Sequence, residues 1–249
     1  MKPRISIIIP AFNEESRIEK TLERICVFIS AEGISAEVVV VDDGSTDATV
    51  QVAQRKLATH PSVISRVLQY DGNKGKGFAV RFGMSNSDAD IVLFSDADLS
   101  TPIEELPKLV EPIFNDECDI AFGSRAIDRS LIGERQPWRR EQGGKIFNLI
   151  VRLFTGLHAS DTQCGFKAFN MVRFRKLLPL LTIDRFGFDV EMLAAANQNG
   201  LRLREVPVRW DNDERSKVRF LRDSLRMFQE VLLIRTRIKQ GAYDFDSTT

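Results

Sequence analysis

The chain has 249 residues with 35 basic and 35 acidic side chains, so its formal net charge is zero and does not favour a nucleic-acid-binding protein. Its three cysteines are far apart and its two histidines lie in no recognisable motif, which argues against a disulfide framework, a histidine-rich zinc site and a Ser-His-Asp triad. No signal peptide and no apolar run of transmembrane length is apparent. We therefore expect a cytoplasmic protein, peripheral on the cytoplasmic face of any membrane that it meets.

Short β-branched runs alternate with amphipathic stretches in the first half of the sequence. The runs predict strands at 5–9, 38–41, 63–68, 91–94 and 119–122, with helices between them. Near-continuous apolar strands separated by helices are typical of a parallel sheet covered on both faces. We therefore predict an α/β fold with a Rossmann-like, mostly parallel sheet and helices on both of its faces.

The alternation fades after about residue 126. An Arg-rich polar stretch precedes an expected helix at 145–154, a helix at 189–198, a strand at 201–208 and a long helix at 218–239. The sequence shows no flexible linker and no internal repeat. We therefore expect one domain, residues 1–217, followed by a C-terminal amphipathic helix and tail, residues 218–249.

Polar segments follow several of the expected strands, at 10–15, 42–47, 95–98 and 123–125. In parallel sheets, ligands bind beyond the carboxyl ends of the strands, where these segments would meet. Asp96 and Asp98 carry the clearest chemistry, because two carboxylates one residue apart are costly unless a cation shares them. Mg²⁺ prefers one or two carboxylates together with substrate phosphate oxygens, so the pair predicts a metal site for a nucleotide diphosphate. The alternative is an Asp-rich turn or helix cap.

Two further loops give weaker signals. A carboxylate of the Asp42-Asp43 pair could accept hydrogen bonds from a nucleotide, or the segment could be a strand-to-helix turn capped by Ser45 or Thr46. The basic glycine loop 73–77 could face phosphates, because glycine permits close backbone approach. This loop lacks the spacing of a P-loop, and a solvated turn is the alternative.

Arginines recur in the second half of the sequence. Arg125, Arg139 and Arg140 could clamp an anion, because the planar guanidinium pairs well with phosphate; a solvated loop is the alternative for the last two. The stretch 218–239 sets leucines and phenylalanines among arginines, so it could lie in a bilayer interface or pack on the sheet as a core helix. The apolar run 146–154 is a second candidate for the interface.

Taken together, these motifs resemble the family 2 glycosyltransferases of GT-A fold, over residues 5 to 217. The resemblance is carried by PAFNEE, VVDDGSTD, GNKGKGFAVRFG, SDADLS and FGSR. The later segments DTQCGFKAF, FGFDVEML, EVPVRW and RSKVRFLRDSLRMF are most similar to dolichyl-phosphate β-glucosyltransferases and their bacterial relatives. The sister group, the dolichyl-phosphate mannose synthases, shares the early motifs but usually carries Arg at the position of Asp211.

This resemblance implies an inverting enzyme that moves a hexose, glucose from UDP-glucose, onto a polyprenyl or dolichyl phosphate; GDP-mannose is the alternative donor. It implies that Asp96 and Asp98 bind Mg²⁺ or Mn²⁺, and that Arg125 and Arg139 grip the acceptor. The residues implied in donor binding are Pro10, Ala11, Phe12, Glu14, Val41, Asp43, Lys76, Ala97 and Lys217.

Two positions depart from the family pattern. Ser100 stands where some mannose synthases supply a third metal ligand, and a hydroxyl is a weaker ligand than a carboxylate. Arg215 stands where relatives often have Gly before the Ser-Lys pair, which leaves the place of Lys217 open.

The nature of the acceptor decides whether a general base is needed. A phosphate monoester is largely anionic at neutral pH and needs none. A sugar hydroxyl needs a carboxylate base, for which Asp189 or Glu191 could serve, so transfer to a hydroxyl remains an alternative. A nucleotidyltransferase is disfavoured because no Gly-rich basic loop follows the first strand, and a catalytically inactive lipid-surface protein is disfavoured by the intact carboxylate pair.

Overall fold

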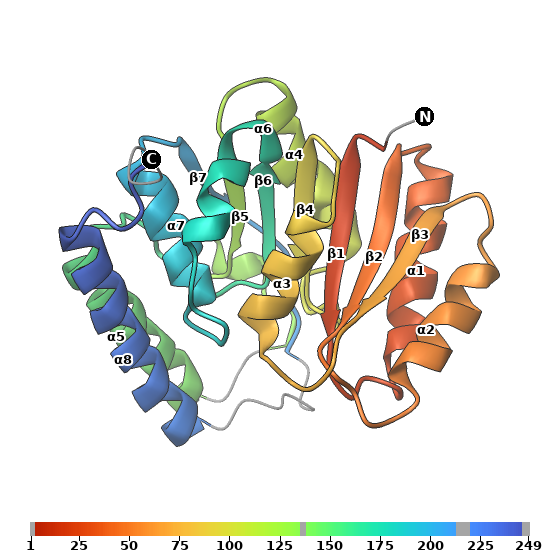
Figure 1. Cartoon of the computed structure of the whole chain (residues 1–249), viewed down its shortest axis with the longest axis horizontal. Helices are drawn as coiled ribbons and strands as arrows, with labels where there is room; N and C mark the ends of the chain where they lie inside the picture. The colour runs from red at the N-terminus through yellow and green to blue at the C-terminus, as the bar shows by residue number, and fades with distance from the viewer. Residues whose placement is uncertain (1–2, 135–137, 213–219, 246–249) are drawn as a thin grey trace.

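The structure is a computed structural model that describes residues 3–134, 138–212 and 220–245, without the side chains of residues 139–140 and 220–225. Within these residues, seven strands form one sheet through the centre of the molecule, with helices on both faces (Figure 1). The strands are β1 (Ile5–Ala11), β2 (Ala36–Asp42), β3 (Ile64–Gln69), β4 (Ile91–Ser95), β5 (Ile120–Ser124), β6 (Phe166–Asn170) and β7 (Leu203–Pro207). The predicted α/β fold is confirmed.

The strand order is β3-β2-β1-β4-β6-β5-β7. All neighbouring strands are parallel except β6, which runs antiparallel to both β4 and β5. The sequence analysis did not predict β6. Because of its direction, the residues that precede β6 arrive at the same edge of the sheet as the residues that follow β4 and β5.

Alternation along the buried strands divides the core into two layers. In β2, Val38 and Val40 belong to the apolar cluster on one face, and Val39 and Val41 to the cluster on the other. Successive strand side chains point to opposite faces, so a run of four valines is suited to a strand covered on both sides.

The helices fall into two groups by the layer that they bury. The first layer is covered by α1 (Ile18–Ala31), α2 (Thr49–Ala58) and α4 (Leu106–Phe114). The second is covered by α3 (Lys76–Ser85), α5 (Trp138–Thr155), α6 (Met171–Phe174), α7 (Phe188–Gln198) and α8 (Phe220–Lys239). In α1, the buried Ile18, Leu22, Ile25 and Ile29 recur at the spacing of one helical face.

Helices α5 and α8 lie side by side and reach toward the carboxyl ends of the strands (Figure 1). The rings of Phe154 and Phe228 meet edge to face, with their centroids 6.2 Å apart. Val231 and Ile234 of α8 are fully buried in the second layer, where α8 packs on α5 and α7, whereas Leu232 and Leu233 are 37% and 48% exposed. The bilayer-interface alternative for this segment stays a prediction. In the part of the chain that the structure describes, no helix combines the length and apolar character needed to cross a bilayer. The domain boundary expected at residue 217 falls outside the described residues.

Candidate active site

A cavity of about 790 Å³ opens where the segments after β1, β4 and β5 meet the loop before α3. Ten residues that the sequence predicted as catalytic or donor-binding line this cavity: Pro10, Ala11, Phe12, Glu14, Asp43, Lys76, Asp96, Ala97, Asp98 and Arg125. The polar strand ends therefore do converge, as expected for a sheet of this kind.

Of the three other site residues named from the sequence, one lies in the core and two fall outside the described residues. Val41 is completely buried in the core between the sheet and α3, so it presents no surface to the cavity. Its place follows from the alternation of β2, which turns Asp42 and Val41 to opposite faces. The side chain of Arg139 and all of Lys217 lie outside the described residues, and their roles stay predictions.

Asp96 and Asp98 sit on a tight turn directly after β4. The turn is closed by a hydrogen bond from Leu99 N to Asp96 O of 3.1 Å, and Leu99 adopts a φ of 49°. The Ser100 amide donates to Asp98 Oδ1 over 2.9 Å. Burial raises the pKa of Asp98, and the neighbouring charge of Asp96 raises it further. Two carboxylates held together in this way favour a bound cation, because each destabilises the charge of the other.

The donor set at this turn suits a divalent cation that is shared with a ligand. Among the residues that the structure describes, no cluster of three or more His, Cys, Asp or Glu side chains is present. Two carboxylates leave coordination positions for diphosphate oxygens and water, which is the arrangement that Mg²⁺ prefers. Ser100, which stands where some mannose synthases supply a third ligand, also lines the cavity.

Asp96 is packed against the backbone of Gly165, which immediately precedes β6. The Asp96 amide donates to Gly165 O over 3.1 Å. A Cβ atom at Gly165 would lie 2.0 Å from Asp96 Oδ2 and 2.4 Å from Asp96 Cγ. Any side chain here would therefore push the carboxylate away, so Gly165 helps to position Asp96.

Lys76, the first residue of α3, forms an ion pair with Asp96, with 2.5 Å between Nζ and Oδ1. Burial acts to lower the pKa of Lys76, but the carboxylates of Asp96 and Asp189 outweigh it, so the pKa is raised overall. The ammonium is therefore charged at neutral pH and brings a cation to the carboxylate pair.

Asp43 anchors the basic glycine loop. Its carboxylate accepts hydrogen bonds from Tyr70 Oη (2.9 Å), Asn73 Nδ2 (2.9 Å) and the amides of Lys74 (2.7 Å) and Gly75 (2.9 Å). A carboxylate offers about four lone-pair positions, and these donors use them. Asp43 thus fixes the loop that carries Lys76, and its expected contact with the nucleotide stays a prediction.

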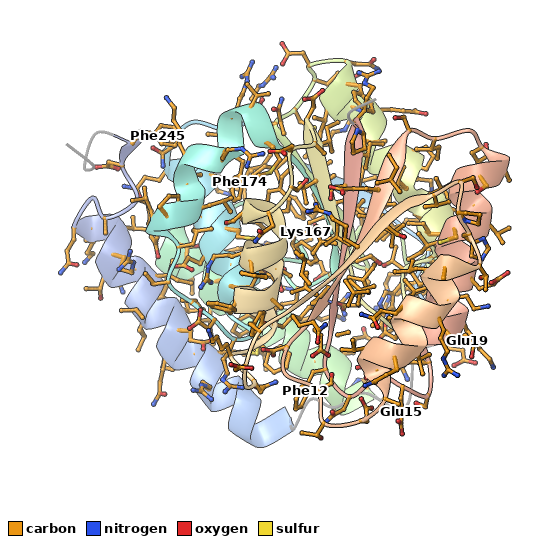
Figure 2. All side chains as sticks on the ribbon, turned by 45° about the vertical axis from the view of Figure 1, so that its right-hand side comes forward. Phe12, Glu15, Glu19, Lys167, Phe174 and Phe245 are labelled. Carbon is orange, nitrogen blue, oxygen red and sulfur yellow. The ribbon has the colours of Figure 1, made fainter. Side chains whose placement is uncertain are left out.

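Glu14 and Arg17 form a buried pair beside the segment that follows β1. The guanidinium donates through Nε and Nη2 to both carboxylate oxygens, with 3.1 Å for the Nη2–Oε1 bond. Arg17 also lines the cavity and acts to lower the pKa of Asp98. The sequence analysis missed Arg17, although its place three residues after Glu14, at the start of α1, was a usable signal. Phe12 lies at the same end of the molecule, near the lower edge in Figure 2.

Arg125 is held by Asp161 in a paired, largely buried arrangement. Its Nε and Nη2 groups donate to the two carboxylate oxygens over 2.6 and 2.8 Å, and its guanidinium carbon lies 5.4 Å from the ring centroid of Trp210. Burial opposes ionisation of Asp161, but Arg125 outweighs it and lowers the pKa of that carboxyl to about 2. Asp161 therefore fixes the guanidinium of Arg125, which lines the cavity.

A third buried pair, Lys167 and Asp189, braces the cavity wall, with Lys167 at the centre of the molecule (Figure 2). Lys167 is fully buried, and its Nζ donates to Asp189 Oδ1 over 2.6 Å and to Cys164 O over 2.5 Å. Burial raises the pKa of Asp189 although Lys167 and Lys76 act to lower it. No sequence pattern predicts this pair, because it joins an unpredicted strand to a helix.

Glu191 does not face the cavity. Its carboxylate accepts hydrogen bonds from the amides of Thr182 (3.0 Å) and Ile183 (2.9 Å) and from Tyr243 Oη (2.9 Å). These bonds hold the 182–183 segment and the C-terminal segment against α7. Of the two bases considered for a hydroxyl acceptor, only Asp189 lines the cavity, and it is already paired with Lys167.

The apolar side of the cavity comes largely from α5 and α8. Ile146, Phe147 and Ile150 of α5 and Met227 and Phe228 of α8 contribute to it. Sequence reasoning identified both helices as amphipathic but did not place them at the site. A smaller cavity of about 160 Å³ adjoins the first through Arg125, Gly144 and Trp210, and it adds the cationic side chains of Arg129 and Lys145.

A mostly parallel sheet with an acidic turn after β4, a basic loop before α3 and a cavity across the strand ends defines a glycosyltransferase of GT-A architecture. A family model described as glycosyl transferase family 2 matches residues 6–178. The chain belongs to this family and is an enzyme of the glycosyltransferase class, as the motifs predicted.

Curated relatives resemble the chain over nearly its whole length. A dolichyl-phosphate beta-glucosyltransferase of Drosophila melanogaster is 37% identical over 96% of this chain and 76% of its own length. The proteins of the same name from Dictyostelium discoideum and Homo sapiens are 31% and 32% identical, each over 98% of this chain and over 77% and 79% of their own lengths. The resemblance inferred from the later motifs is confirmed.

Solved structures support the fold. Glucosyl-3-phosphoglycerate synthase of Mycobacterium tuberculosis, determined in complex with Mn²⁺, UDP-glucose and phosphoglyceric acid, has a TM-score of 0.64 at 19% identity. The match covers 95% of this chain and 80% of that protein. Its complex with UDP alone has a TM-score of 0.67 at 20% identity, with 94% and 80% coverage.

Proposed function

We propose that the chain transfers glucose from UDP-glucose to a polyprenyl phosphate of the dolichyl type, with inversion at the anomeric carbon, using Mg²⁺ or Mn²⁺ at Asp96 and Asp98. The observation that carries this proposal is one cavity that joins a paired-carboxylate turn and a basic loop to an apolar wall from two amphipathic helices. The names of the curated relatives support the same sugar and acceptor.

The donor would lie across the polar strand ends. Asp96 and Asp98 would hold the cation, which when bound neutralises the charge growing on the leaving diphosphate. Lys76 would approach the same diphosphate from the basic loop, and Pro10 and Phe12 line the part of the cavity suited to the nucleotide. The contacts of Glu14, Asp43 and Ala97 with the donor belong to the same proposal.

The acceptor phosphate would approach from the Arg125 side. The second pKa of a phosphate monoester is about 6, so at neutral pH the acceptor phosphate can act as a nucleophile without first losing a proton. Arg125 can orient its oxygens because Asp161 fixes the guanidinium. Asp189 is paired with Lys167 and Glu191 points away from the cavity, so the geometry favours this acceptor over a sugar hydroxyl that needs a base.

The lipid part of the acceptor would follow α5 and α8 to a membrane surface. Ile146, Leu149 and Leu153 of α5 are 61%, 56% and 71% exposed, and their spacing puts them on one face of the helix. Ile146 also lines the cavity, so the apolar wall and the exposed face are continuous. Lys145 and Arg152 flank this face and suit an anionic bilayer.

The test is a matrix of donors and acceptors. UDP-glucose and GDP-mannose are each incubated with polyprenyl phosphate, or with a soluble sugar, in the presence of Mg²⁺, Mn²⁺ or EDTA. We expect transfer from UDP-glucose to the lipid phosphate, lost in EDTA. Transfer from GDP-mannose alone would establish the alternative donor, and transfer to the soluble sugar alone would contradict the proposed acceptor.

A further inference from the structure

The two lysines of the basic loop lie in different surroundings. Lys76 Nζ is 2.5 Å from Asp96 Oδ1 and faces the rings of Phe94 and Phe188, with centroid distances of 5.9 and 5.7 Å. Lys74 Nζ instead lies over the ring of Phe78, 4.5 Å from its centroid. Only Lys76 therefore contacts the carboxylate pair, and Lys74 provides a matched comparison from the same loop.

The Lys76–Asp96 contact competes with metal binding. One carboxylate oxygen cannot both accept a short hydrogen bond from an ammonium and ligate a divalent cation from the same direction. A metal that approaches Asp96 Oδ1 from this direction displaces Lys76, which costs a charge-assisted hydrogen bond. A nucleotide diphosphate offers a second anionic partner to the displaced ammonium.

The loop geometry confines this displacement to the Lys76 side chain. The amide of Gly75 is bound by Asp43, and Gly75 packs so closely that a Cβ atom there would lie 2.4 Å from Asp184 O. The backbone before Lys76 is therefore fixed. A flexible four-carbon stem on a fixed backbone lets the ammonium move between two neighbouring anions.

We propose that Lys76 is an internal counter-cation that couples metal binding to donor binding. Its ammonium holds Asp96 until a nucleotide diphosphate receives it, so a divalent cation binds tightly only together with the nucleotide. This inference rests on the proposed metal site at Asp96 and Asp98. Lys76 is then a positioning residue for the metal as well as a residue of the donor site.

The experiment measures Mn²⁺ affinity by electron paramagnetic resonance, with and without UDP or GDP, and with protein-free blanks for nucleotide-bound metal. Without nucleotide, K76M should bind Mn²⁺ about ten- to a hundred-fold more tightly than the unaltered protein, the factor expected from one charge-assisted hydrogen bond. The gain in Mn²⁺ affinity on adding nucleotide should shrink in K76M. By linkage, the gain in nucleotide affinity on adding Mn²⁺ should shrink by the same factor.

Three further variants separate the explanations. K74M should behave like the unaltered protein, K76R should keep the coupling because it keeps the charge, and D96N should lose tight Mn²⁺ binding. Should K76M prove poorly folded by circular dichroism, K76Q takes its place. Equal or weaker Mn²⁺ binding by K76M and K76Q than by the unaltered protein, with D96N still impaired, overturns the proposed role of Lys76 but leaves the metal site standing. Unchanged Mn²⁺ binding by D96N overturns the metal site as well.

Discussion

The two sides of the cavity are built from different interactions. On the sheet side, charged groups are fixed by short hydrogen bonds, as in the Arg125–Asp161 and Lys167–Asp189 pairs and in the loop bound by Asp43. On the helix side, α5 and α8 present apolar side chains both to the cavity and to the outside. The part suited to phosphate and metal is therefore preorganised by hydrogen bonds, whereas the part suited to lipid is an apolar surface.

On the sheet side, removing the proposed metal ligands should have the largest effect on activity. D96N and D98N should each lower kcat/KM roughly a thousandfold, because several kcal/mol of charge stabilisation are lost and each 1.36 kcal/mol is tenfold. The measurement is transfer of radiolabelled glucose to polyprenyl phosphate, with D88N as a control, since Asp88 is exposed and precedes β4. Near-normal activity of D96N in the presence of EDTA would contradict a metal-dependent mechanism.

On the sheet side, the buried Lys167–Asp189 pair should contribute to the free energy of unfolding. K167M should reduce the free energy of unfolding by about 3–5 kcal/mol, because it leaves Asp189 buried without its partner. Urea denaturation followed by circular dichroism measures this loss. The control is K145M, whose lysine is 57% exposed and pairs with Glu141 at the surface, where such pairs contribute about 0–1 kcal/mol. Equal stability of the two variants would show that the buried pair is not a brace.

Removing the proposed contact between Arg125 and the acceptor phosphate should have a smaller effect on activity. R125A should lower kcat/KM for polyprenyl phosphate about ten- to a hundred-fold and leave UDP affinity nearly unchanged, because one charge-assisted contact is lost on the acceptor side. R55A, on the exposed polar face of α2, is the control. A loss of UDP binding in R125A that matches its loss of activity would move Arg125 to the donor side.

The helix side can be tested without unfolding the protein. Leu149→Gln combined with Leu153→Gln should weaken binding to anionic vesicles several-fold, because both side chains are already exposed and each change removes apolar surface from the interface. Val172→Gln is the control, since Val172 is 77% exposed on α6. Deleting α8 would be a poorer test, because it would uncover Val231 and Ile234. Unchanged flotation of the double variant with vesicles would contradict the proposed interface.

Sequence reasoning located the parts of the site that follow parallel strands. Those strands are apolar and β-branched, so their ends and the acidic turn at Asp96 could be predicted. It missed β6, whose short sequence FKAFN carries a lysine and contains no β-branched residue. Because β6 is antiparallel, the residues before it, Gln163 and Gly165, reach the site. A search of carboxyl strand ends alone cannot find such residues.

Val41 shows a second limit of sequence reasoning. It directly precedes the acidic segment and was implied in donor binding, but the alternation of β2 turns it into the core. Proximity in sequence to a binding residue therefore says little about a strand residue, since the next position faces the opposite side. The pairing of Asp189 with Lys167 could not be predicted either, because it depends on the packing of α7 against β6.

The contact between Gly165 and Asp96 restricts which sequences this protein can tolerate. Gly165 does not have a positive φ, so a side chain there would meet no left-handed backbone strain and the limit is one of space. In a fully randomised library at position 165, selection for transferase activity should return glycine almost exclusively, whereas selection for soluble expression alone should return other small residues too. At position 144, where a Cβ atom would meet nothing within 4 Å, both selections should accept alanine. The space that the Asp96 carboxylate needs thus restricts position 165 to glycine in any active sequence.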